Sequence, residues 1–482
     1  MRYILLGEFV IDQDLTLIFS RASGDFNPLH TNPIIARRYQ FGSTVVHGVC
    51  ATLKALDLYI GSRSESVSLT SIKASYIKPI RHGDKVEVFV SNLNSSDVKL
   101  KLVCQGSRCQ QIQFRLKIRT SKHLHLYPKK YAINEKHPIC SDILFEESQD
   151  KIGAVPLVWD EELTAELFPS LKRCLPDYQV CLILGTTNIV GMHCPGLNSV
   201  YGSFRLSFVE EALSFEQSLR YKVSHSDHRF MKSLISLIHP AVQGELEAFF
   251  RARPVVQCGF DEIKSLVQPN QFVGQTALII GGSRGLGEIT GKLISAGKGR
   301  VFLTYASGKS DAEAVVNNIK AGGGHCESLY YDVLTPVNNH FKFLENQKIT
   351  HIYYFASPQI EKSGTKIWNE LLFRKYTDFY LTGLARLLEY FVSNSDYHCS
   401  RTDVFAPSTE FINEPIKGYS EYIASKAAME LFAEQLENKY SGWRFSTPRL
   451  PRLLTDQTSS VLQESPTKAV ETILAQLAKL YY

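Results

Sequence analysis

Two clusters of residues could do chemistry, and they lie near opposite ends of the chain. The first is Asp25-Phe26-Asn27-Pro28-Leu29-His30, which places a carboxylate and an imidazole five residues apart around a proline. Because proline favours a turn, both groups are expected on one loop. Together they can hold a water molecule, take a proton from it and deliver a proton to a neighbouring carbon. Such a pair suits the addition or removal of water at an activated double bond.

Two further residues could support this first cluster. The amide of Asn27 can fix the loop or bond a carbonyl group of a ligand. Gly48 stands at the start of an apolar helix expected over residues 49–59. Its backbone N–H, with the helix dipole behind it, could stabilise an enolate oxygen. The alternative is that Asp25 only opens an Asx turn and His30 is an ordinary surface side chain.

The second cluster is Tyr422-Ile423-Ala424-Ser425-Lys426. Residues four apart share one face of a helix. A lysine cation lowers the pKa of a neighbouring phenol, which suits proton donation to a carbonyl that receives a hydride. A lone Tyr-x-x-x-Lys is mostly a solvated helix face. Here it gains meaning because a glycine-rich loop begins 141 residues earlier, at Gly281.

That loop follows an apolar run, residues 276–280, which is typical of a buried parallel strand. Glycines in such a turn let the backbone approach a pyrophosphate at a helix N-terminus. The sequence therefore predicts a dinucleotide site with contacts from Gly281, Ser283, Arg284, Gly285, Leu286 and Gly287.

The next predicted strand, residues 301–305, indicates which dinucleotide is bound. No carboxylate follows it to grip the ribose hydroxyls, as NAD would require. Arg284 and Ser307 could meet a 2′-phosphate instead, with Lys309 as a more distant candidate. The sequence thus predicts NADP(H), with Asp332 placed to face the adenine.

The elements that must position the two clusters differ in type. Strands alternate with helical stretches over residues 270–482, which indicates an α/β doubly wound parallel sheet. Residues 1–260 carry β-rich runs, such as 86–90 and 114–118, and an apolar helix near 45–60. This is an α+β pattern.

A weak internal repeat divides the first half of the chain. Residues 68–76 resemble residues 196–204, an offset of 128. Duplication of a small domain would explain it, although two unrelated strands could match by chance. The same offset carries Asp25 and His30 to Gly153 and Val158, so the second copy is expected to be catalytically silent and to serve as a packing partner.

Three domains are therefore expected, over residues 1–122, 123–265 and 266–482, with a linker near 123–147. The net charge of +5 suits anionic ligands and is too small to indicate nucleic acid. The ten cysteines form no metal-binding pattern, so no metal site is expected. No apolar run approaches the ~20 residues of a membrane span, and the N-terminus makes a poor signal peptide, which predicts a cytoplasmic protein.

The first 120 residues carry four linked motifs: Ser23-Gly24-Asp25-Phe26-Asn27-Pro28-Leu29-His30, Val46-His47-Gly48, Tyr76-Ile77-Lys78-Pro79 and Gly83-Asp84. In these motifs the segment resembles the MaoC-like R-specific enoyl-CoA hydratases, which have the hot-dog fold. The resemblance implies that Asp25 and His30 activate water and protonate the α-carbon, and that Gly48 contributes to an oxyanion hole. It also implies an (R)-3-hydroxyacyl or trans-2-enoyl thioester of CoA or a carrier protein as substrate. Residues 130–260 look like a second, degenerate hot-dog copy.

Residues 270–482 resemble the short-chain dehydrogenases/reductases, most of all the 3-oxoacyl-thioester reductases. The resemblance implies Tyr422 as the acid, Lys426 as the group that tunes it and contacts the ribose, and an upstream hydroxyl that polarises the carbonyl. Ser408 and Thr409 are the candidates for that hydroxyl. Thr409 has the commoner spacing, but we expect Ser408 because serine is the commoner residue type. Self-association through this domain is also implied.

The second resemblance has departures. The segment Phe355-Ala356-Ser357 stands where Asn-Ala-Gly is usual, and Tyr380 takes the place of the asparagine that holds a relay water. Ile280 replaces a threonine, and Pro448-Arg449-Leu450-Pro451 lacks the usual Pro-Gly. The proton relay and the nicotinamide pocket are therefore expected to be altered.

Together the two clusters predict a bifunctional enzyme whose two steps share a 3-hydroxyacyl intermediate. It would serve fatty-acid, polyketide or related acyl-group synthesis. Three alternatives stay open. One is a hydratase with a degenerate, structural or regulatory reductase domain. Another is a non-enzymatic NADP-dependent sensor. The third is a reductase of another carbonyl, such as a sugar.

Overall fold

The computed structural model describes residues 3–61, 63, 65–91, 97–119, 139–209, 214–337, 340–364, 367–394, 398–458 and 466–481. The chain forms two compact units, Met1–Arg253 and Pro254–Tyr482, and each is described by itself. The predicted boundary at 122/123 and most of the predicted linker lie outside the described residues. The division at Arg253 comes before the expected boundary at 265/266. The reason is that helix α8 (Phe260–Lys264) places Phe260 and Ile263 in the core of the second unit.

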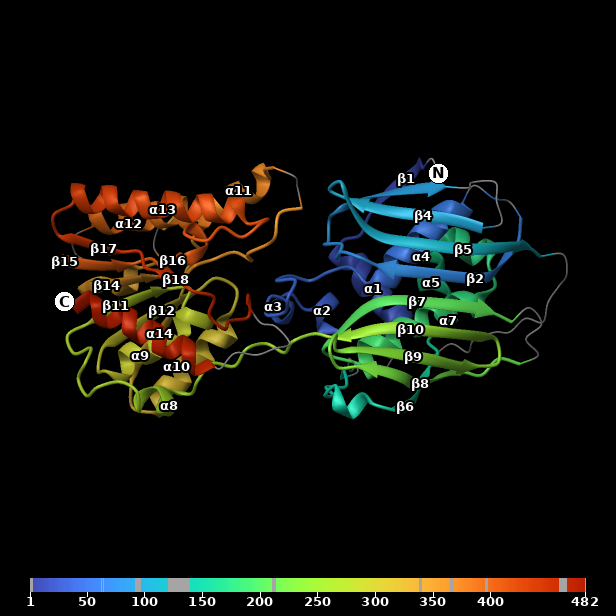
Figure 1. Cartoon of the computed structure of the whole chain (residues 1–482), viewed down its shortest axis with the longest axis horizontal. Helices are drawn as coiled ribbons and strands as arrows, with labels where there is room; N and C mark the ends of the chain where they lie inside the picture. The colour runs from blue at the N-terminus through green and yellow to red at the C-terminus, as the bar shows by residue number, and fades with distance from the viewer. Residues whose placement is uncertain are drawn as a thin grey trace. The chain divides into compact units, whose positions relative to one another are not determined.

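The first unit is built on one ten-stranded sheet, in which neighbouring strands run antiparallel (Figure 1). Its two halves have the same strand order, β1-β3-β4-β5-β2 and β6-β8-β9-β10-β7, and they meet where β2 pairs with β7. The strands are β1 (Ile4–Val10), β2 (Val67–Tyr76), β3 (Lys85–Ser91), β4 (Asp97–Cys104), β5 (Ser107–Ile118), β6 (Ile152–Pro156), β7 (Ser199–Phe208), β8 (Ser218–Asp227), β9 (Lys232–His239) and β10 (Val242–Phe250).

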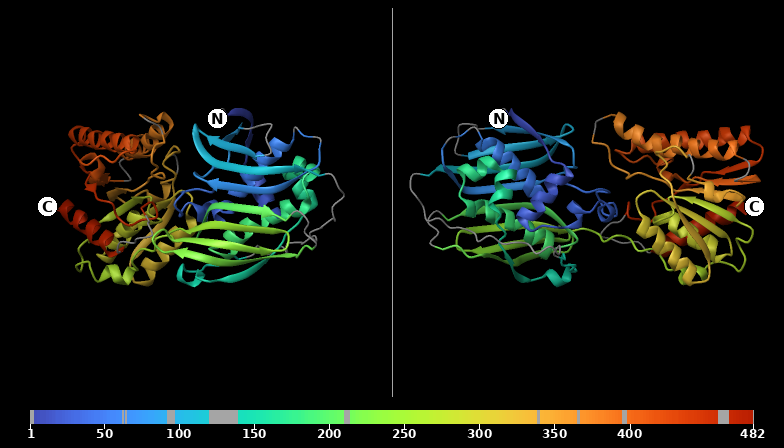
Figure 2. Two further views of the ribbon diagram at one scale, coloured as in Figure 1. Left: turned by 45° about the vertical axis from the view of Figure 1, so that its right-hand side comes forward. Right: turned by 180° about the vertical axis from the view of Figure 1, so that it is seen from behind.

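Helices cover one face of this sheet, as the view from behind in Figure 2 shows. Each half holds one long apolar helix against its strands, α4 in the first half and α7 in the second, and nearly every residue of α7 is buried. Full burial of an aliphatic side chain contributes about 1.5–3 kcal/mol, so these two helices anchor the core. The helices are α1 (Gln13–Ser23), α2 (Pro28–Thr31), α3 (Pro33–Ala36), α4 (Gly48–Ile60), α5 (Glu161–Leu167), α6 (Pro169–Cys174), α7 (Asp177–Asn188) and the π-helix η2 (Ile189–His193).

The two halves differ in the segment before the long helix. In the first half, residues 24–47 connect α1 to α4 and carry the Asp25–His30 motif. In the second half, only residues 168–176 lie between α5 and α7. The fixed offset of 128 is therefore wrong for this segment: Gly153 lies on strand β6 and Val158 lies two residues after its end. The second half lacks the whole motif-bearing connection.

The second unit confirms the predicted doubly wound parallel sheet. Its strand order is β13-β12-β11-β14-β15-β17, which reverses direction between β11 and β14. In such sheets ligands bind beyond the carboxyl ends of the strands at this reversal. The strands are β11 (Thr276–Ile280), β12 (Arg300–Tyr305), β13 (His325–Tyr330), β14 (Ile349–Tyr354), β15 (His398–Phe405) and β17 (Trp443–Ser446), with the short pair β16 (Ser408–Thr409) and β18 (Arg449–Leu450) beside them.

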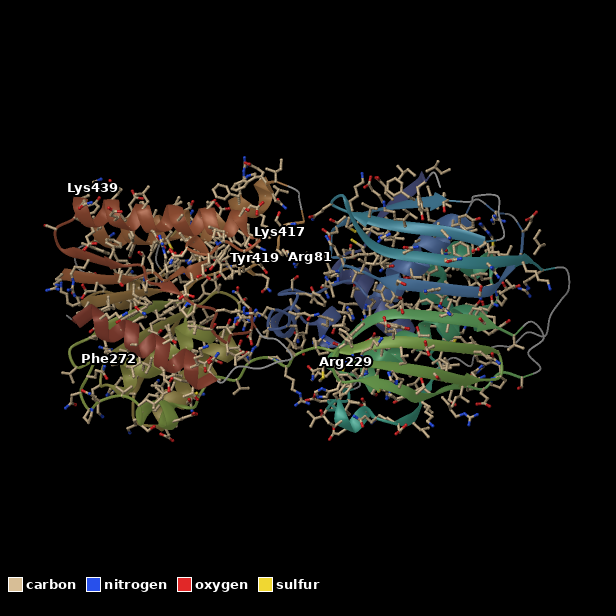
Figure 3. The ribbon with its side chains drawn as sticks, viewed as in Figure 1. Arg81, Arg229, Phe272, Lys417, Tyr419 and Lys439 are labelled. Carbon is tan, nitrogen blue, oxygen red and sulfur yellow. The ribbon has the colours of Figure 1, made fainter. Side chains whose placement is uncertain are left out.

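Helices cover both faces of this sheet (Figure 1). Alternate residues of β11 enter different cores: Ile279 joins the core formed with α9, α10 and α14, and Leu278 joins the core formed with α12 and α13. Tyr419 and Lys439, labelled in Figure 3, mark the two ends of α13. The helices are α9 (Gly285–Ala296), α10 (Lys309–Ala321), α11 (Glu370–Thr377), the π-helix η4 (Asp378–Thr382), α12 (Gly383–Ser393), α13 (Ser420–Lys439) and α14 (Pro466–Ala478). In the described part of the chain, no helix has the length and apolar character needed to cross a membrane.

Candidate active sites

Helix caps shape the Asp25–His30 motif. Helix α1 ends at Gly24, which adopts the left-handed conformation (φ 76°) that only glycine tolerates easily. The side chain of Asn27 caps α2 by accepting the N–H of Leu29, and Pro28 occupies the first helical position. Asp25 thus lies between two helices, and His30 lies one turn further on within α2. The predicted loop is confirmed, with a short helix at its end.

Asp25 is buried, with 1% of its side chain exposed. Burial raises its pKa from 3.8 to about 6, although hydrogen bonds from Thr187 and from the backbone of Asn27 lower the pKa and offset part of this effect. The hydroxyl of Thr187 donates to Oδ2 at 2.6 Å, and the N–H of Asn27 donates to Oδ1 at 3.1 Å. Asp25 is therefore a carboxylate at neutral pH, and a stronger base than an exposed aspartate.

His30 is arranged as a neutral base. Its Nδ1 donates to the carbonyl oxygen of Val45 at 2.7 Å, because a carbonyl can only accept, and Nε2 is left with a lone pair. Burial lowers the pKa of His30 to about 4. The ring of His47 stacks on it, with centroids 3.8 Å apart, and His47 Nε2 donates to the backbone oxygen of Asp25 at 3.2 Å.

Ligand atoms of Asp25, His30 and His47 lie within 4.8 Å of one another, a spacing that could suit a metal ion. The stacked rings argue against it. Ring nitrogens direct their lone pairs in the ring plane, so two stacked imidazoles present them side by side and not toward one point. The N–H that His47 directs at the Asp25 carbonyl is a further obstacle. The geometry suits proton chemistry.

Both polar atoms of the Asn27 side chain form hydrogen bonds within the protein. Its Nδ2 donates to the carbonyl oxygens of Gly191 at 2.8 Å and Gly196 at 3.0 Å, both in the second half of the unit. Its Oδ1 caps α2. Of the two roles considered for Asn27, the structure favours fixing the loop over binding a ligand.

A cavity of about 300 Å³ opens beside this pair. Both halves of the unit line it. Gly48, the first residue of α4, belongs to the lining, and a Cβ at this position would lie 2.7 Å from the ring of Tyr76. Glycine therefore allows a ligand and the Tyr76 ring to approach the helix N-terminus. The lining includes Asp25, His30, Gly48, Tyr76, Thr187 and Tyr201.

Thr187 and Gly191 are functional candidates that sequence reasoning missed. Both lie in the half that was expected to be catalytically silent. A Cβ on Gly191 would lie 2.3 Å from Asp25 Oδ1, so the carboxylate rests directly against this glycine. The one sequence signal was the polar run Thr186-Thr187-Asn188 at the end of an apolar helix.

In the second unit, the glycine loop joins β11 to α9 at the reversal point of the sheet. Gly281 has φ 78°, and the N–H groups of Gly281 and Gly282 donate to Thr304 at the end of β12. A Cβ on Gly287 would lie 2.3 Å from the carbonyl oxygen of Gly281, whereas one on Gly285 would meet nothing closer than 3.6 Å. The loop is thus tightly packed at Gly287, whereas the space next to Gly285 is open. A loop that holds a pyrophosphate at a helix N-terminus needs such an open side.

The remaining predicted cofactor contacts surround this loop. Ser283 is buried within it, and Leu286 packs on the adjoining core. Ser307 follows β12 and is exposed, and Asp332 follows β13, where its Oδ1 accepts the N–H of Leu334. Arg284 forms an ion pair with Asp456 at 3.2 Å, so a carboxylate of the chain holds the side chain predicted for the 2′-phosphate.

Tyr422 and Lys426 share the buried face of α13, as predicted from their spacing. Burial raises the pKa of Tyr422 to about 12 and lowers that of Lys426 to about 7. Lys426 Nζ donates to the carbonyl oxygen of Pro407 at 2.8 Å.

Of the two candidate hydroxyls, that of Thr409 lies within reach of Tyr422, and the role expected for Ser408 stays a prediction. A hydrogen bond from the Thr409 side chain moderates the raised pKa of Tyr422. The hydroxyl of Ser408 is buried without a hydrogen-bond partner among the described residues. Nearby, hydrogen bonds from Arg449 lower the pKa of the Glu430 carboxyl despite its burial. Neighbouring residues of β16 point to opposite sides, so only one of them can face Tyr422.

Tyr380 lies against Tyr422 and Lys426, where the sequence predicts an altered proton relay. Its ring centroid is 4.0 Å from Lys426 Nζ and 5.9 Å from the ring of Tyr422. Its hydroxyl is 2.6 Å from Ser357 Oγ. An aromatic face therefore meets the lysine, a cation–π contact in place of a polar side chain.

Comparison with known proteins gives a family match within the first unit. Residues 7–110 match the family model of the MaoC like domain. A curated relative, the Probable dehydratase NIT22 of Ajellomyces capsulatus, is 27% identical over 101 residues, or 20% of this chain. The match spans 26% of that relative's length.

Several solved structures similar to the chain are named as short-chain dehydrogenases or reductases. A short chain dehydrogenase from Burkholderia cenocepacia J2315 in complex with NADP is 18% identical, covers 43% of this chain and 90% of its own, and gives a TM-score of 0.38. FolM alternative dihydrofolate reductase 1 from Brucella suis in complex with NADP is 16% identical, covers 42% and 89%, and gives a TM-score of 0.36. The fold of the second unit follows from its own sheet order.

Proposed function

We propose that the chain is a bifunctional acyl-thioester enzyme for fatty-acid, polyketide or related acyl-group synthesis. Its second unit would reduce a 3-oxoacyl thioester with NADPH, and its first would dehydrate the (R)-3-hydroxyacyl product to the trans-2-enoyl form. The observation that carries the proposal is the buried Asp25–His30 pair at a cavity wall, inside the stretch that matches the MaoC like domain.

The domain organisation follows from the same proposal. The two halves of the first unit, with their common strand order, are two hot-dog copies. The first, residues 1–122, holds the acid–base pair, and the second, residues 123–253, completes the cavity. Residues 254–482 form the reductase. The division at Arg253 replaces the boundary expected from the sequence.

In the first unit, water binds between the Asp25 carboxylate and Nε2 of His30, both of which accept hydrogen bonds. During hydration the pair takes a proton from this water as its oxygen attacks the β-carbon, and returns a proton to the α-carbon. The N–H of Gly48 stabilises the enolate oxygen of the thioester at the positive end of α4. Dehydration is the reverse sequence, so protons balance in both directions.

The glycine loop of the second unit fits a dinucleotide, because it is open above Gly285 and compact below Gly287. The loop and the N-terminus of α9 would hold the pyrophosphate, with Ser307 near the 2′-phosphate and Asp332 near the adenine. The NADP complexes among the similar structures agree with this choice. When bound, NADPH supplies a hydride to the carbonyl carbon.

The chain's own residues handle the proton in that reduction. Tyr422 donates its phenolic proton to the carbonyl oxygen, and Thr409 polarises the same oxygen with its hydroxyl. Lys426, when charged, lowers the cost of forming the tyrosinate. We assign the polarising role to Thr409 because its hydroxyl meets Tyr422.

Two assays test the two activities separately. Crotonyl-CoA should lose its enoyl absorbance with the wild-type protein and keep it with Asp25→Asn. Acetoacetyl-CoA with NADPH should show cofactor oxidation that Tyr422→Phe abolishes. Each variant is the control for the other, since each leaves the second site intact. Hydration by Asp25→Asn at the wild-type rate would refute the site in the first unit.

Self-association through the reductase unit stays part of the proposal, as does the choice between CoA and a carrier protein. Sedimentation of the full chain tests the first point. Comparison of matched CoA and carrier-protein thioesters tests the second. No NADPH oxidation with either carrier would limit the chain to the dehydratase activity.

One observation favours a second candidate, a dehydratase whose reductase unit binds NADP without turnover. The ring of Tyr380 contacts Lys426, and the resemblance implies an asparagine that holds a relay water at the position of Tyr380. A titration that shows tight NADPH binding, together with no oxidation on any 3-oxoacyl thioester, would establish this candidate.

A further inference from the structure

We propose that Thr187 is a positioning residue of the dehydratase site: its hydroxyl keeps Asp25 ionised and fixes the orientation of the carboxylate. The proposal rests on the proposed function of Asp25. Thr187 belongs to the half without an acid–base pair and lies outside the stretch that matches the MaoC like domain. The second half would then be part of the catalytic apparatus as well as a packing partner.

The contact itself is short and shielded from water. Thr187 Oγ1 lies 2.6 Å from Asp25 Oδ2, and the two side chains are 4% and 1% exposed. An ionised carboxylate only accepts, so the threonine hydroxyl must donate. Hydroxyl-to-carboxylate bonds of this length are among the stronger hydrogen bonds in proteins.

Asp25 has few other sources of stabilisation. Oδ1 accepts the backbone N–H of Asn27, and His47 Nε2, 3.8 Å from Oδ2, already donates to a backbone oxygen. No lysine or arginine pairs with Asp25 among the described residues. Thr187 is therefore the one side-chain donor within hydrogen-bonding distance of the carboxylate in the described part of the unit.

The other titratable groups that face Asp25 are neutral near pH 7. His30 and His47 have lowered pKa values because of burial. From the second half, Cys140 and Tyr201 feel the Asp25 charge, and burial raises the pKa of each. A change in the titration of Asp25 would thus report on Thr187 and not on a neighbouring charge.

The position of Thr187 beside Asp25 is fixed by contacts at the end of α7. It lies in the last turn of α7, directly before the π-helix η2, and Asn188 next to it donates to the carbonyl oxygen of Ser23 at 3.3 Å. Gly191 in η2 leaves room for the carboxylate, since a Cβ there would lie 2.3 Å from Oδ1. The end of α7 is thereby held against the loop that carries Asp25.

Asp25 already titrates near pH 6 with this hydrogen bond in place. Without the bond its pKa should rise by about one unit, because hydrogen bonds to charged groups are worth roughly that much. Near neutral pH, about half of the molecules would then carry a protonated Asp25. The dehydratase would lose its base at the pH where it works.

The test compares Thr187→Val, which keeps the shape and removes the donor, with Thr187→Ser, which keeps the donor. Thr164→Val is the matched control, because Thr164 is a buried threonine in the same half whose hydroxyl bonds only the Asp160 carbonyl among the residues that the structure describes. One measurement is the carboxyl ¹³C titration of Asp25, assigned by its loss in Asp25→Asn. The other is the pH dependence of crotonyl-CoA hydration.

We expect the Asp25 titration and the acid limb of the rate to move up by about one pH unit in Thr187→Val. Thr187→Ser should stay near wild type, and Thr164→Val should not move. An unchanged Asp25 titration in Thr187→Val would overturn the proposal, even if the rate falls. If the wild type hydrates no thioester, the proposed function fails, while the ¹³C titration still decides the role of Thr187.

Discussion

Burial makes the ionised form of the Asp25 carboxylate energetically costly, and this carboxylate is the base of the proposed site. Its pKa in the folded chain is about 6 instead of 3.8. Stability from this group is therefore present below pH 3.8 and is lost as the pH rises through 6. The chain loses stability because it keeps a basic carboxylate in a buried position.

The change Asp25→Asn should abolish hydration and stabilise the first unit. At pH 8 we expect a gain in the free energy of unfolding of up to about 3 kcal/mol, since each pKa unit corresponds to about 1.4 kcal/mol. Most of the gain should vanish at pH 4, where the folded wild type is protonated too. Denaturant unfolding at both pH values measures this. An equal gain at pH 4 and pH 8 would show that the amide acts through packing alone.

Lys426 carries the opposite shift. Burial lowers its pKa from 10.5 to about 7, so the cation is present below pH 7 and is lost above it. We expect NADPH oxidation with acetoacetyl-CoA to fall about tenfold per pH unit above the pKa. Hydration by the same preparation is the control, because no group of that site titrates in this way. A constant rate of oxidation up to pH 9 would show that the lysine charge is not needed.

Among the elements, the π-helix η2 is the one whose geometry serves the site most directly. Its wider turn presents the carbonyl of Gly191 to Asn27 and leaves the Asp25 carboxylate against a residue without a side chain. π-Turns of this kind often occur at functional sites.

Gly191→Ala should therefore displace the carboxylate. A shift of about 1 Å can lower a rate on the order of 100-fold, and we expect a loss of that size in hydration with little change in folding. Gly185→Ala is the matched control: its Cβ would meet the end of the flexible Leu157 side chain at 2.7 Å, away from Asp25. Equal losses in both variants would assign the effect to helix packing.

Sequence reasoning succeeded where chemistry is local and failed where it depends on pairing across the sheet. Gly24, Asn27 and Pro28 act as helix caps, so the loop around Asp25 could be predicted from neighbouring residues alone. Thr187 meets Asp25 through the association of the two halves, in which β2 pairs with β7 and α1 packs against α7, and no local pattern reveals this association. The missing connection in the second half made the fixed offset of 128 misleading.

The choice between Ser408 and Thr409 could not be made from the sequence for a related reason. The two residues are adjacent, and in a strand adjacent side chains point to opposite sides. Which side faces Tyr422 depends on the surrounding fold and not on the local sequence. Residue type favoured serine, whereas the contact with Tyr422 supports our proposal of threonine.

For the molecule as a whole, the two proposed sites act on one shared compound, which is the product of one site and the substrate of the other. The reductase would release a 3-hydroxyacyl thioester, which is the compound that the dehydratase consumes. Each unit has its own core, so damage to one site should leave the other intact. The chain can therefore be divided functionally by single substitutions.

With acetoacetyl-CoA and NADPH, the wild type should form crotonyl-CoA, with one NADPH oxidised for each ketone reduced. Asp25→Asn should stop at 3-hydroxybutyryl-CoA with the oxidation intact, and Tyr422→Phe should leave both substrate and NADPH unchanged. An equimolar mixture of the two variants should form crotonyl-CoA after a lag, because the intermediate must diffuse from one chain to another. Chromatography of the thioesters over time measures all four cases. If the 3-hydroxy compound accumulates in the mixture and no enoyl product forms, the dehydratase does not accept the 3-hydroxybutyryl-CoA that the reductase releases. The two activities would then belong to different substrates.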